Sequence, residues 1–444
     1  MTGDVLVVEG RIAEVGKNIA ASDCEIVDAT DFFILPGFVE CHRHLWQTPL
    51  RHLGTDWDLP QMFVELFVKL APRMTAQDVY HATLYGRLTA IDAGITTLLD
   101  WAHIQNTPEH TDACIDALRV GGGRSIFGHG QPGHDPKPWM DDSTLAHPQD
   151  IRRVRQNILS SDDSLVTLAM AARGPEFCKM DVVATDIALA RELGIRVTMH
   201  VGMGRKGAEK HAIEKMHQDH LLGPDLTCLH CCHSTDHEFR LLADHGASAG
   251  VSACMAMFAA GFGLPATGRM MAQGLRPSLS TDSEMTASGD MFTEMRAAFS
   301  GERMIRNNDI PNGPERAPIT VRDVLNFATI DGARTVGLER HVGSISPGKK
   351  ADLILIRRNA LNLGPAIDPI AALVVGGHCG NVEAVLVEGR PVKWGGELLK
   401  IDVNAARRNL AQTCARLEVY HDRQERSTAA PSEVSGNQRT NDSK

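Results

Sequence analysis

The sequence Pro36-Gly37-Phe38-Val39-Glu40-Cys41-His42-Arg43-His44 closes an apolar run that predicts a β-strand with two histidines at its end. Because successive side chains of a strand point to opposite faces, His42 and His44 project to the same side. The pair is either one half of a metal site or two unrelated polar residues. Three further candidates decide between these readings, because each lies at the end of another strand-like run: His200, His230 and Asp282.

Apolar runs alternate with helical stretches through most of the chain. The predicted strands cover 34–41, 95–100, 125–128, 165–171, 195–200, 227–231, 248–253 and 276–281. Alternating strands and helices favour a parallel sheet, and eight such units close naturally into a (β/α)8 barrel. A doubly wound open sheet is the alternative, but no GxGxxG follows an early strand. The pattern therefore favours the barrel.

Both ends of the chain have short strand-like runs with turns. They fall within residues 4–33 at the beginning and near 351–356 and 382–389 at the other end, and neither set can form a core alone. We expect one small β domain built from 1–34 and 342–400, with the barrel at 35–341 inserted between them. A helix is expected at 401–420, and the polar segment 421–444 is predicted to be a disordered tail.

The composition of the chain argues against several classes of function. The chain has 444 residues, 43% of them hydrophobic, and a formal net charge of −10 without clustered Lys and Arg, which argues against a nucleic-acid binder. We find no apolar leader and no run long enough to span a bilayer. Ten cysteines in so long a chain fit a reducing compartment better than a disulfide framework. A cytoplasmic protein with no membrane partner is expected.

The predicted barrel places the candidate residues at the same end of the domain. Barrel chemistry collects at the carboxyl ends of the strands, so the histidines of the first, fifth and sixth strands and Asp282 of the eighth converge on one mouth. Three imidazoles and a carboxylate suit one Zn²⁺ or Fe²⁺ ion, which would turn bound water into a hydroxide nucleophile. Asp282 could then carry the proton, and His230 could polarise the substrate.

These residues resemble the amidohydrolase superfamily, in its mononuclear branch of cytosine deaminase-like and chlorotriazine hydrolase-like enzymes. The resemblance rests on the stretches 35–44, 94–100, 229–238 and 279–282 and on the tail signature at 343–353. It implies a distorted barrel with a β-sandwich from both termini. It also implies that His42, His44, His200 and Asp282 hold the metal and that His230 is the catalytic histidine, with His233 as its rival.

One position departs from the family pattern. Deaminases of this branch have a glutamate three residues after the fifth-strand histidine, and it passes a proton to a ring nitrogen. Here the stretch is His200-Val201-Gly202-Met203, and a thioether cannot carry a proton. Either another group protonates the leaving atom, or the substrate needs no ring protonation.

Several further residues follow the predicted strands and are candidates for binding substrate. Gln47 and Arg173 are possible polar selectors, with Arg173 the partner of any substrate carboxylate, and the tryptophans are possible stacking walls. Met255 lies in an apolar, adaptable stretch. Loop packing is the competing interpretation for each. The predicted set is Trp46, Gln47, Trp101, His103, Arg173, Met203 and Met255.

The resulting hypothesis is a metal-dependent hydrolase that attacks a planar carbon of a cyclic or heteroaromatic small molecule and cleaves a C–N bond. Hydrolytic displacement of halide or thiolate at such a carbon is the alternative within the same chemistry. A non-catalytic scaffold is the alternative of a different class, and the apparently complete ligand set disfavours it. The resemblance also leads us to expect a homodimer or higher homo-oligomer.

Overall fold

A computed structural model describes residues 2–22, 24–259, 261–308 and 315–418. Eight parallel strands form its centre in the order β11-β10-β9-β8-β7-β6-β5-β4, and an isolated parallel bridge between Arg43 and Asp282 joins the two ends of this sheet. The barrel is therefore nearly closed. Its strands are β4 (Phe38–Arg43), β5 (Ile95–Ala102), β6 (Arg124–His129), β7 (Val166–Ala172), β8 (Arg196–Val201), β9 (Leu226–His230), β10 (Ser248–Val251) and β11 (Ser278–Leu279).

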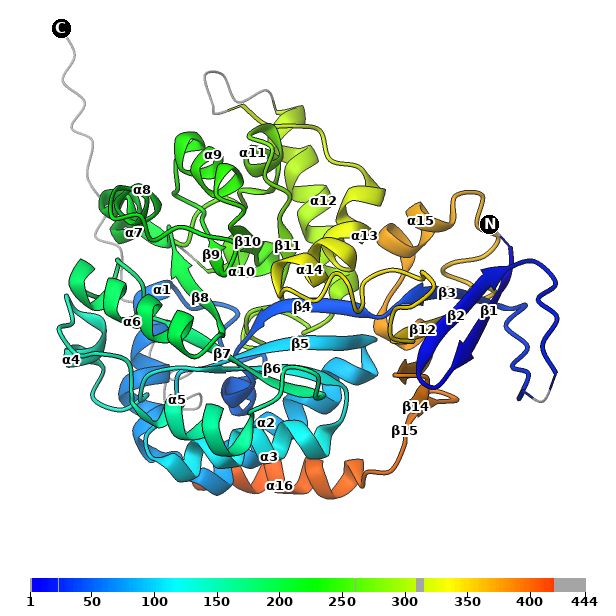
Figure 1. The fold of residues 1–444 in the computed structure, drawn as a ribbon, viewed down its shortest axis with the longest axis horizontal. Coiled ribbons are helices and arrows are strands. Elements are labelled where there is room, and N and C mark those ends of the chain that lie inside the picture. The colour runs from blue at the N-terminus through cyan, green and yellow to red at the C-terminus, as the bar shows by residue number, and fades with distance from the viewer. Residues whose placement is uncertain (1, 23, 260, 309–314, 419–444) are drawn as a thin grey trace, which may run out of the picture.

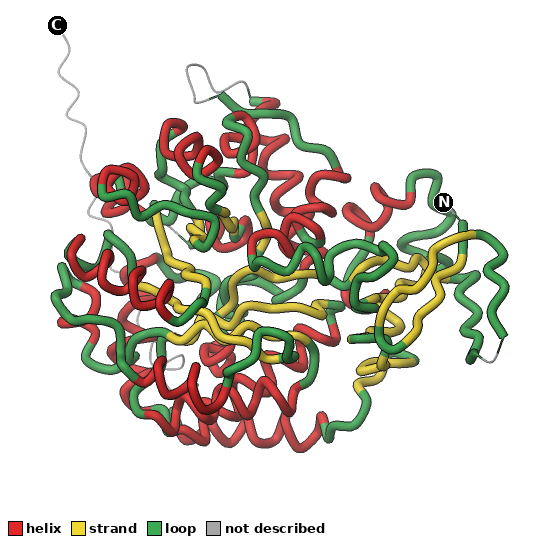
Figure 2. The backbone as a smooth tube through the Cα atoms, viewed as in Figure 1, coloured by secondary structure: helices red, strands yellow, loops and turns green. Residues whose placement is uncertain are grey.

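Helices surround the strands on the outside, as Figure 2 shows. Capping boxes begin three of the described α-helices, with Thr75 and Asp78 at α2, Thr235 and Glu238 at α9, and Thr320 and Asp323 at α13. The α-helices are α1 (Leu59–Phe63), α2 (Ala76–Asp92), α3 (Pro108–Gly121), α4 (Pro136–Met140), α5 (Asp150–Arg153), α6 (Met180–Glu192), α7 (Gly204–Lys210), α8 (Ala212–Gln218), α9 (Asp236–Asp244), α10 (Ala253–Phe258), α11 (Thr267–Ala272), α12 (Met291–Asn307), α13 (Val321–Phe327), α14 (Ile330–Thr335), α15 (Pro369–Ala371) and α16 (Val403–Arg416). Short 3-10 and π segments are η1 (Leu45–Leu50), η2 (Val64–Leu70), η3 (Ala71–Arg73), η4 (Val154–Ile158), η5 (Ala372–Gly376) and η6 (Cys379–Asn381).

The run that was expected to be one first strand is two strands. β3 (Phe32–Pro36) pairs with β12 (Leu353–Arg357), and β4 begins the barrel after Gly37. The Gly37 N–H donates to the carbonyl of Asp352, and a Cβ at this position would lie 2.1 Å from the Thr96 hydroxyl oxygen. A glycine is needed here because the chain passes so close to β5 while it changes sheet.

Both ends of the chain build the small β domain, which lies at one side of the barrel in Figure 1. β1 (Asp4–Val8) and β2 (Arg11–Gly16) form an antiparallel pair, and a second antiparallel sheet has the order β15-β14-β13-β12-β3. This second sheet uses β13 (Val382–Val387), β14 (Arg390–Trp394) and β15 (Glu397–Leu398). Buried Ile12, Ala351 and Leu353 pack between the two sheets. The fold is thus an α/β barrel with a β-sandwich from both termini.

The last described helix, α16, packs its buried residues Ala406 and Leu410 toward the barrel, and Ala406 contacts Leu84 and Leu88 of α2. It ends at Arg416, short of the predicted 420. The predicted tail 421–444 lies outside the described residues. Within the described part of the chain, no helix has the length and apolar character needed to cross a bilayer.

Candidate active site

The predicted ligands meet at the carboxyl end of the barrel. One ligand atom each of His42, His200 and His230 lie within 4.8 Å of one another, and the same holds for His42, His44 and Asp282. Oδ1 of Asp282 lies 3.4 Å from Nε2 of His42 and 3.3 Å from Nε2 of His44. Strands β4, β8, β9 and β11 therefore bring together five side chains that are far apart in the sequence.

The polar atoms of this cluster fit a cation. His42 is fully buried, and apart from the 3.4 Å contact of Nε2 with Asp282, its ring nitrogens have no hydrogen-bond partner among the described residues. Nδ1 of His44 lies 2.7 Å from the carbonyl of Trp101, so this nitrogen carries the proton and leaves the lone pair of Nε2 free. Such a carbonyl partner is what orients metal-ligating histidines. Unpartnered buried nitrogens next to a carboxylate are the donor set expected for Zn²⁺ or Fe²⁺.

The protonation states agree with ligation. Burial lowers the pKa of His42 to about 4, assisted by neighbouring His44, and burial likewise lowers the pKa of His230 to about 4. Burial alone would raise the pKa of Asp282, but the imidazoles around it hold this pKa below its ordinary value. At neutral pH the cluster therefore offers neutral imidazoles and an ionised carboxylate, which are the forms that bind cations.

Two of these residues have strained backbones. His230 has φ +70° and Asp282 has φ +62°, in the left-handed region that non-glycine residues seldom occupy. Such strain is typical of functional sites, where the surrounding fold holds a side chain in place. His230 also stacks on His200, with 5.2 Å between ring centroids and 7° between planes. Its rival His233 is exposed and does not line the cavity described below.

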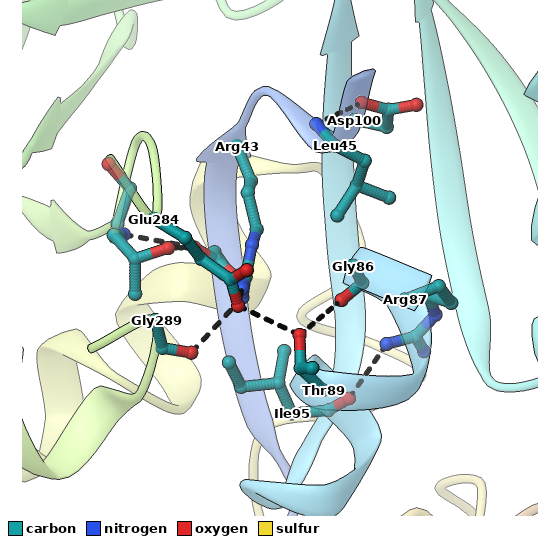
Figure 3. Close-up of polar contacts among 12 residues, drawn as sticks. Arg43, Leu45, Gly86, Arg87, Thr89, Ile95, Asp100, Glu284 and Gly289 are labelled. Carbon is teal, nitrogen blue, oxygen red and sulfur yellow. Dashed lines mark hydrogen bonds and ion pairs between the residues drawn. The ribbon is translucent and has the colours of Figure 1, made fainter. Parts of the chain in front are cut away.

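A buried ionic network holds the seam between β4 and β11, next to Asp282. Arg43 donates to Glu40, to Glu284 and to the carbonyl of Gly289, while Glu40 accepts from the backbone N–H of Thr281. Figure 3 shows Arg43 pointing from β4 toward Glu284 and Gly289, with Thr89 of α2 bound to the same carboxylate. Thr281, the residue before Asp282, is therefore hydrogen-bonded to β4, the strand that leads to His42 and His44.

The cluster lies at the base of a cavity of about 620 Å³, including its opening. Its lining includes Gln47, Trp101, His103 and Gln131 in addition to the histidines and Asp282. The rest is apolar and rich in methionine. The apolar lining residues are Leu59, Met62, Phe63, Leu66, Phe67, Met140, Phe177, Met203, Met255, Phe262 and Met285.

Most of the predicted substrate-binding residues line this cavity, namely Gln47, Trp101, His103, Arg173, Met203 and Met255. Trp46 does not, and its expected position as a stacking wall is wrong. It is fully buried on η1, and its indole Nε1–H donates to Nδ1 of His103 over 3.0 Å. The η1 turn directs Trp46 away from the opening, which the sequence could not indicate.

Arg173 lines the cavity, but its guanidinium is already engaged. Nη1 of Arg173 donates to the Ser143 hydroxyl at 2.9 Å. Nη2 donates to the Leu145 carbonyl at 2.5 Å and lies 3.3 Å from Oδ2 of Asp186. Because Asp186 neutralises this charge, Arg173 is poorly placed as the partner of a substrate carboxylate, contrary to our expectation.

Sequence reasoning missed two groups of residues. The segment that carries Met62, Phe63 and Phe67 contributes apolar side chains to the lining of the cavity, and Gln131, which follows β6, contributes a polar one. Gln131 could have been found from its position after a strand end. Glu176 was also missed. It is buried, accepts from the Gly202 N–H, and its pKa is raised to about 7 by burial.

Comparison with known proteins places the chain in a family. Residues 33–392 match the sequence profile of the amidohydrolase family. A 5-methylthioadenosine/S-adenosylhomocysteine deaminase from Symbiobacterium thermophilum is 28% identical over 407 residues, covering 88% of each chain.

Two zinc-containing crystal structures share the fold. An adenosine deaminase from Xanthomonas campestris with bound zinc aligns with a TM-score of 0.78 at 22% identity, covering 94% of each chain. An atrazine chlorohydrolase from Arthrobacter aurescens complexed with zinc aligns with a TM-score of 0.80 at 18% identity, covering 94% of this chain and 95% of the other. The fold agrees with the profile match, which covers most of the sequence, and so this chain belongs to the amidohydrolase family.

Proposed function

We propose that the protein is a zinc-dependent hydrolase that cleaves a C–N bond at a planar carbon of a small, uncharged heteroaromatic or cyclic substrate. Membership of the amidohydrolase family makes it a metal-dependent hydrolase of non-peptide C–N bonds. The observation that most directly supports this proposal is the buried cluster of His42, His44, His200 and Asp282 next to the cavity. The scaffold alternative is disfavoured, because His42 belongs to one possible metal-binding group with His44 and Asp282 and to another with His200 and His230.

The substrate class follows from the cavity. Its lining is largely apolar, and the one arginine on it is paired with Asp186. An anionic substrate would find no free positive side chain among the described lining residues. A planar, neutral ring would contact Met and Phe side chains on one side and the amides of Gln47 and Gln131 on the other. The carbonyl oxygens of both amides have no partner in the described protein, so they are available to substrate N–H groups.

The metal would be held by His42, His44, His200 and Asp282. When bound, such an ion lowers the pKa of a bound water toward neutrality. The two oxygens of Asp282 face different partners, since Oδ1 lies near His42 and His44 and Oδ2 lies 3.7 Å from Nε2 of His230. We infer that Asp282 Oδ2 takes up a proton and that His230 relays it toward the leaving group.

A second function is favoured by Met203. With no carboxylate at this position, a substrate whose leaving group needs no protonated ring, such as a halide or thiolate substituent, would suit the cavity equally. The fold shared with an atrazine chlorohydrolase does not by itself decide between the two. The two functions differ in the released product, which makes them separable by assay.

A substrate screen tests the proposal. The purified, zinc-loaded protein is assayed against aminated heterocycles, cyclic amides and halogenated rings, with ammonia, halide and ring opening scored separately. We expect ammonia release. His42→Ala and Asp282→Asn should lower kcat by about 100- to 10,000-fold, whereas His233→Ala, at an exposed histidine, should not. Unchanged turnover in folded His42→Ala and Asp282→Asn proteins would exclude this site.

Two further expectations remain proposals. None of the ten cysteines forms a disulfide in the described structure, and eight of them are buried, which is consistent with a reducing compartment. Assembly as a homodimer is expected from the family resemblance, and light scattering of the purified protein measures it directly.

A further inference from the structure

We propose that His103 is a substrate-binding hydrogen-bond donor whose tautomer is fixed by Trp46, and that the substrate presents a neutral acceptor to it next to the reacting carbon. The acceptor would be a ring nitrogen or a carbonyl oxygen. This inference rests on the proposed function and narrows its substrate class. It assigns Trp46 a positioning role that its place outside the cavity lining would not suggest.

The tautomer follows from the chemistry of the indole group. Nε1 of Trp46 lies 3.0 Å from Nδ1 of His103. An indole N–H can only donate, so Nδ1 of His103 must accept and therefore has no proton. A neutral imidazole with an unprotonated Nδ1 has its proton on Nε2. The hydrogen bond thus selects one of the two neutral forms of His103 and excludes the doubly protonated one.

The position of the ring directs this proton into the cavity. His103 is 5% exposed and lines the cavity, whereas Trp46 lies behind the wall and is fully buried. The two nitrogens are separated by one ring carbon and point in diverging directions, so with Nδ1 turned to Trp46 behind the wall we infer that the Nε2–H points toward the cavity that His103 lines. The one side-chain hydrogen bond of His103 among the described residues is that with Trp46, and the backbone carbonyl of Trp101 also lies next to the ring.

Neighbouring rings keep His103 in this orientation. Its centroid lies 4.4 Å from that of His44, 4.9 Å from Trp101 and 5.1 Å from Phe67. Trp46 meets it edge-on at 5.2 Å with an interplanar angle of 81°. A donor held by packing on several sides loses little entropy when it binds its acceptor. Because His44 is one of the metal-ligand candidates, this donor lies beside the reacting centre.

Met203 and Arg173 also line the cavity, but neither is placed to donate a hydrogen bond to the substrate acceptor. Met203 stands where the family glutamate would protonate a ring nitrogen, and its thioether has no proton to give. Arg173 is engaged with Asp186, Ser143 and Leu145. A neutral Nε2–H can polarise an acceptor through a hydrogen bond without transferring its proton. The structure thereby replaces a charged proton carrier with an uncharged donor, which selects neutral acceptors and disfavours cationic rings.

The tautomer is measured by ¹⁵N NMR on the zinc-loaded enzyme labelled at its histidines. His103→Phe keeps a packed ring and identifies the His103 signals by difference. We expect the wild-type protein to show the Nε2–H pattern for His103. Trp46→Phe removes the indole N–H together with part of the buried ring, keeps an aromatic side chain, and should produce a mixture of both neutral tautomers. An Nδ1–H pattern in the wild type, or no change in Trp46→Phe, would overturn the assignment.

The donor role is tested with minimal probes that need no turnover. N-methyl-2-pyridone is a planar, neutral carbonyl acceptor, and toluene is its apolar control. The pyridone should shift the His103 Nε2 resonance and bind about 10- to 100-fold more weakly to His103→Phe, while His103→Gln, which restores an N–H donor, should recover part of the loss. Toluene should bind both proteins alike. Equal losses for the two probes would show a purely structural role and contradict the proposal.

Failure of this inference is distinguishable from failure of the proposed function. If the wild type releases ammonia but His103 has its proton on Nδ1, only the donor assignment falls. If no substrate is turned over but the tautomer and pyridone results hold, the donor stands and the C–N hydrolase proposal falls.

Discussion

At the scale of single residues, the metal-ligand candidates could be predicted from the sequence, but the contacts that support them could not. His42, His44, His200, His230 and Asp282 each follow a strand-like run, and barrel topology alone predicts that strand ends meet. Nothing in the sequence tells which way a side chain of the η1 turn points, so Trp46 was assigned to the cavity. The partner that neutralises Arg173 is Asp186 on α6, a carboxylate with no local signature.

Met203 is the residue that most limits the chemistry of the cavity. It is partly buried at the N-terminus of α7 and faces the same cavity as His200 and His230. Met203→Glu would restore a proton carrier at the family position. We expect it to raise ammonia release from aminated heterocycles by about 10- to 100-fold, measured by a coupled ammonia assay.

The matched control is Met203→Gln, which has the size and polarity of glutamate but cannot transfer a proton. It should not raise the rate. Equal gains for Met203→Glu and Met203→Gln would mean that shape or polarity, not proton transfer, limits the native enzyme.

At the scale of elements, eight strands could be predicted because apolar runs and their helical spacers are periodic. Their ends were less certain. The first run divides at Gly37, because β3 pairs with a strand more than 300 residues away, and β11 is only Ser278–Leu279 where 276–281 was expected. The covering segment η2 carries no strand or motif signal, so its place over the cavity emerges only from packing.

The position of the short strand β11 depends on the buried ionic network between β4 and β11. Glu40 accepts from both the backbone N–H and the hydroxyl of Thr281, and it pairs with buried Arg43. Glu40→Gln would weaken this network and leave Arg43 less neutralised. We expect a loss of up to roughly 3–5 kcal/mol of stability, seen as a lower Tm, with a smaller fraction of chains retaining metal.

The control for this variant is Glu192→Gln at the exposed pair with Arg152. Ion pairs at the surface contribute little to stability because solvent screens them, so the Tm of this variant should be nearly unchanged. An equally small effect for Glu40→Gln would show that the seam does not hold β11 in place.

At the scale of the whole molecule, buried carboxyls link stability to pH. Glu294 on α12 is fully buried, and burial raises its pKa to about 8 despite hydrogen bonds from the backbone N–H groups of Cys254 and Ala253. An unfolded glutamate titrates at about 4.3. Between these two pH values the folded state keeps a proton that the unfolded state has released.

Stability should therefore fall as the pH rises through this window, by up to about 1.4 kcal/mol per pH unit for this group, until about pH 8. The buried histidines have lowered pKa values, and they add stability with rising pH only up to their unfolded pKa of about 6.5. Glu176, whose pKa is raised to about 7, also titrates close to the range from pH 7 to 8. The contribution of Glu294 is therefore isolated by comparing the wild type with Glu294→Gln over this range.

The measurement is Tm by differential scanning fluorimetry at pH 7 and 8 for the wild type and Glu294→Gln. A chain of this length should show about 1–2 °C of difference per kcal/mol. We expect the wild type to lose more Tm than the variant over this step. Parallel slopes would contradict the assignment of Glu294 as a neutral, buried acid.

The central claim is that His42, His44, His200 and Asp282 bind one catalytic cation, and anomalous X-ray diffraction from crystals of the purified protein at the zinc edge tests it most directly. The account predicts one anomalous peak per chain, with Nε2 of His42 and His44, a ring nitrogen of His200 and a carboxylate oxygen of Asp282 at bonding distance, about 2.0–2.2 Å. A peak that remains strong just below the zinc edge and disappears only below the iron edge would change the metal to iron but keep the site. A metal-loaded, active protein whose only peak lies away from these four side chains would contradict the account.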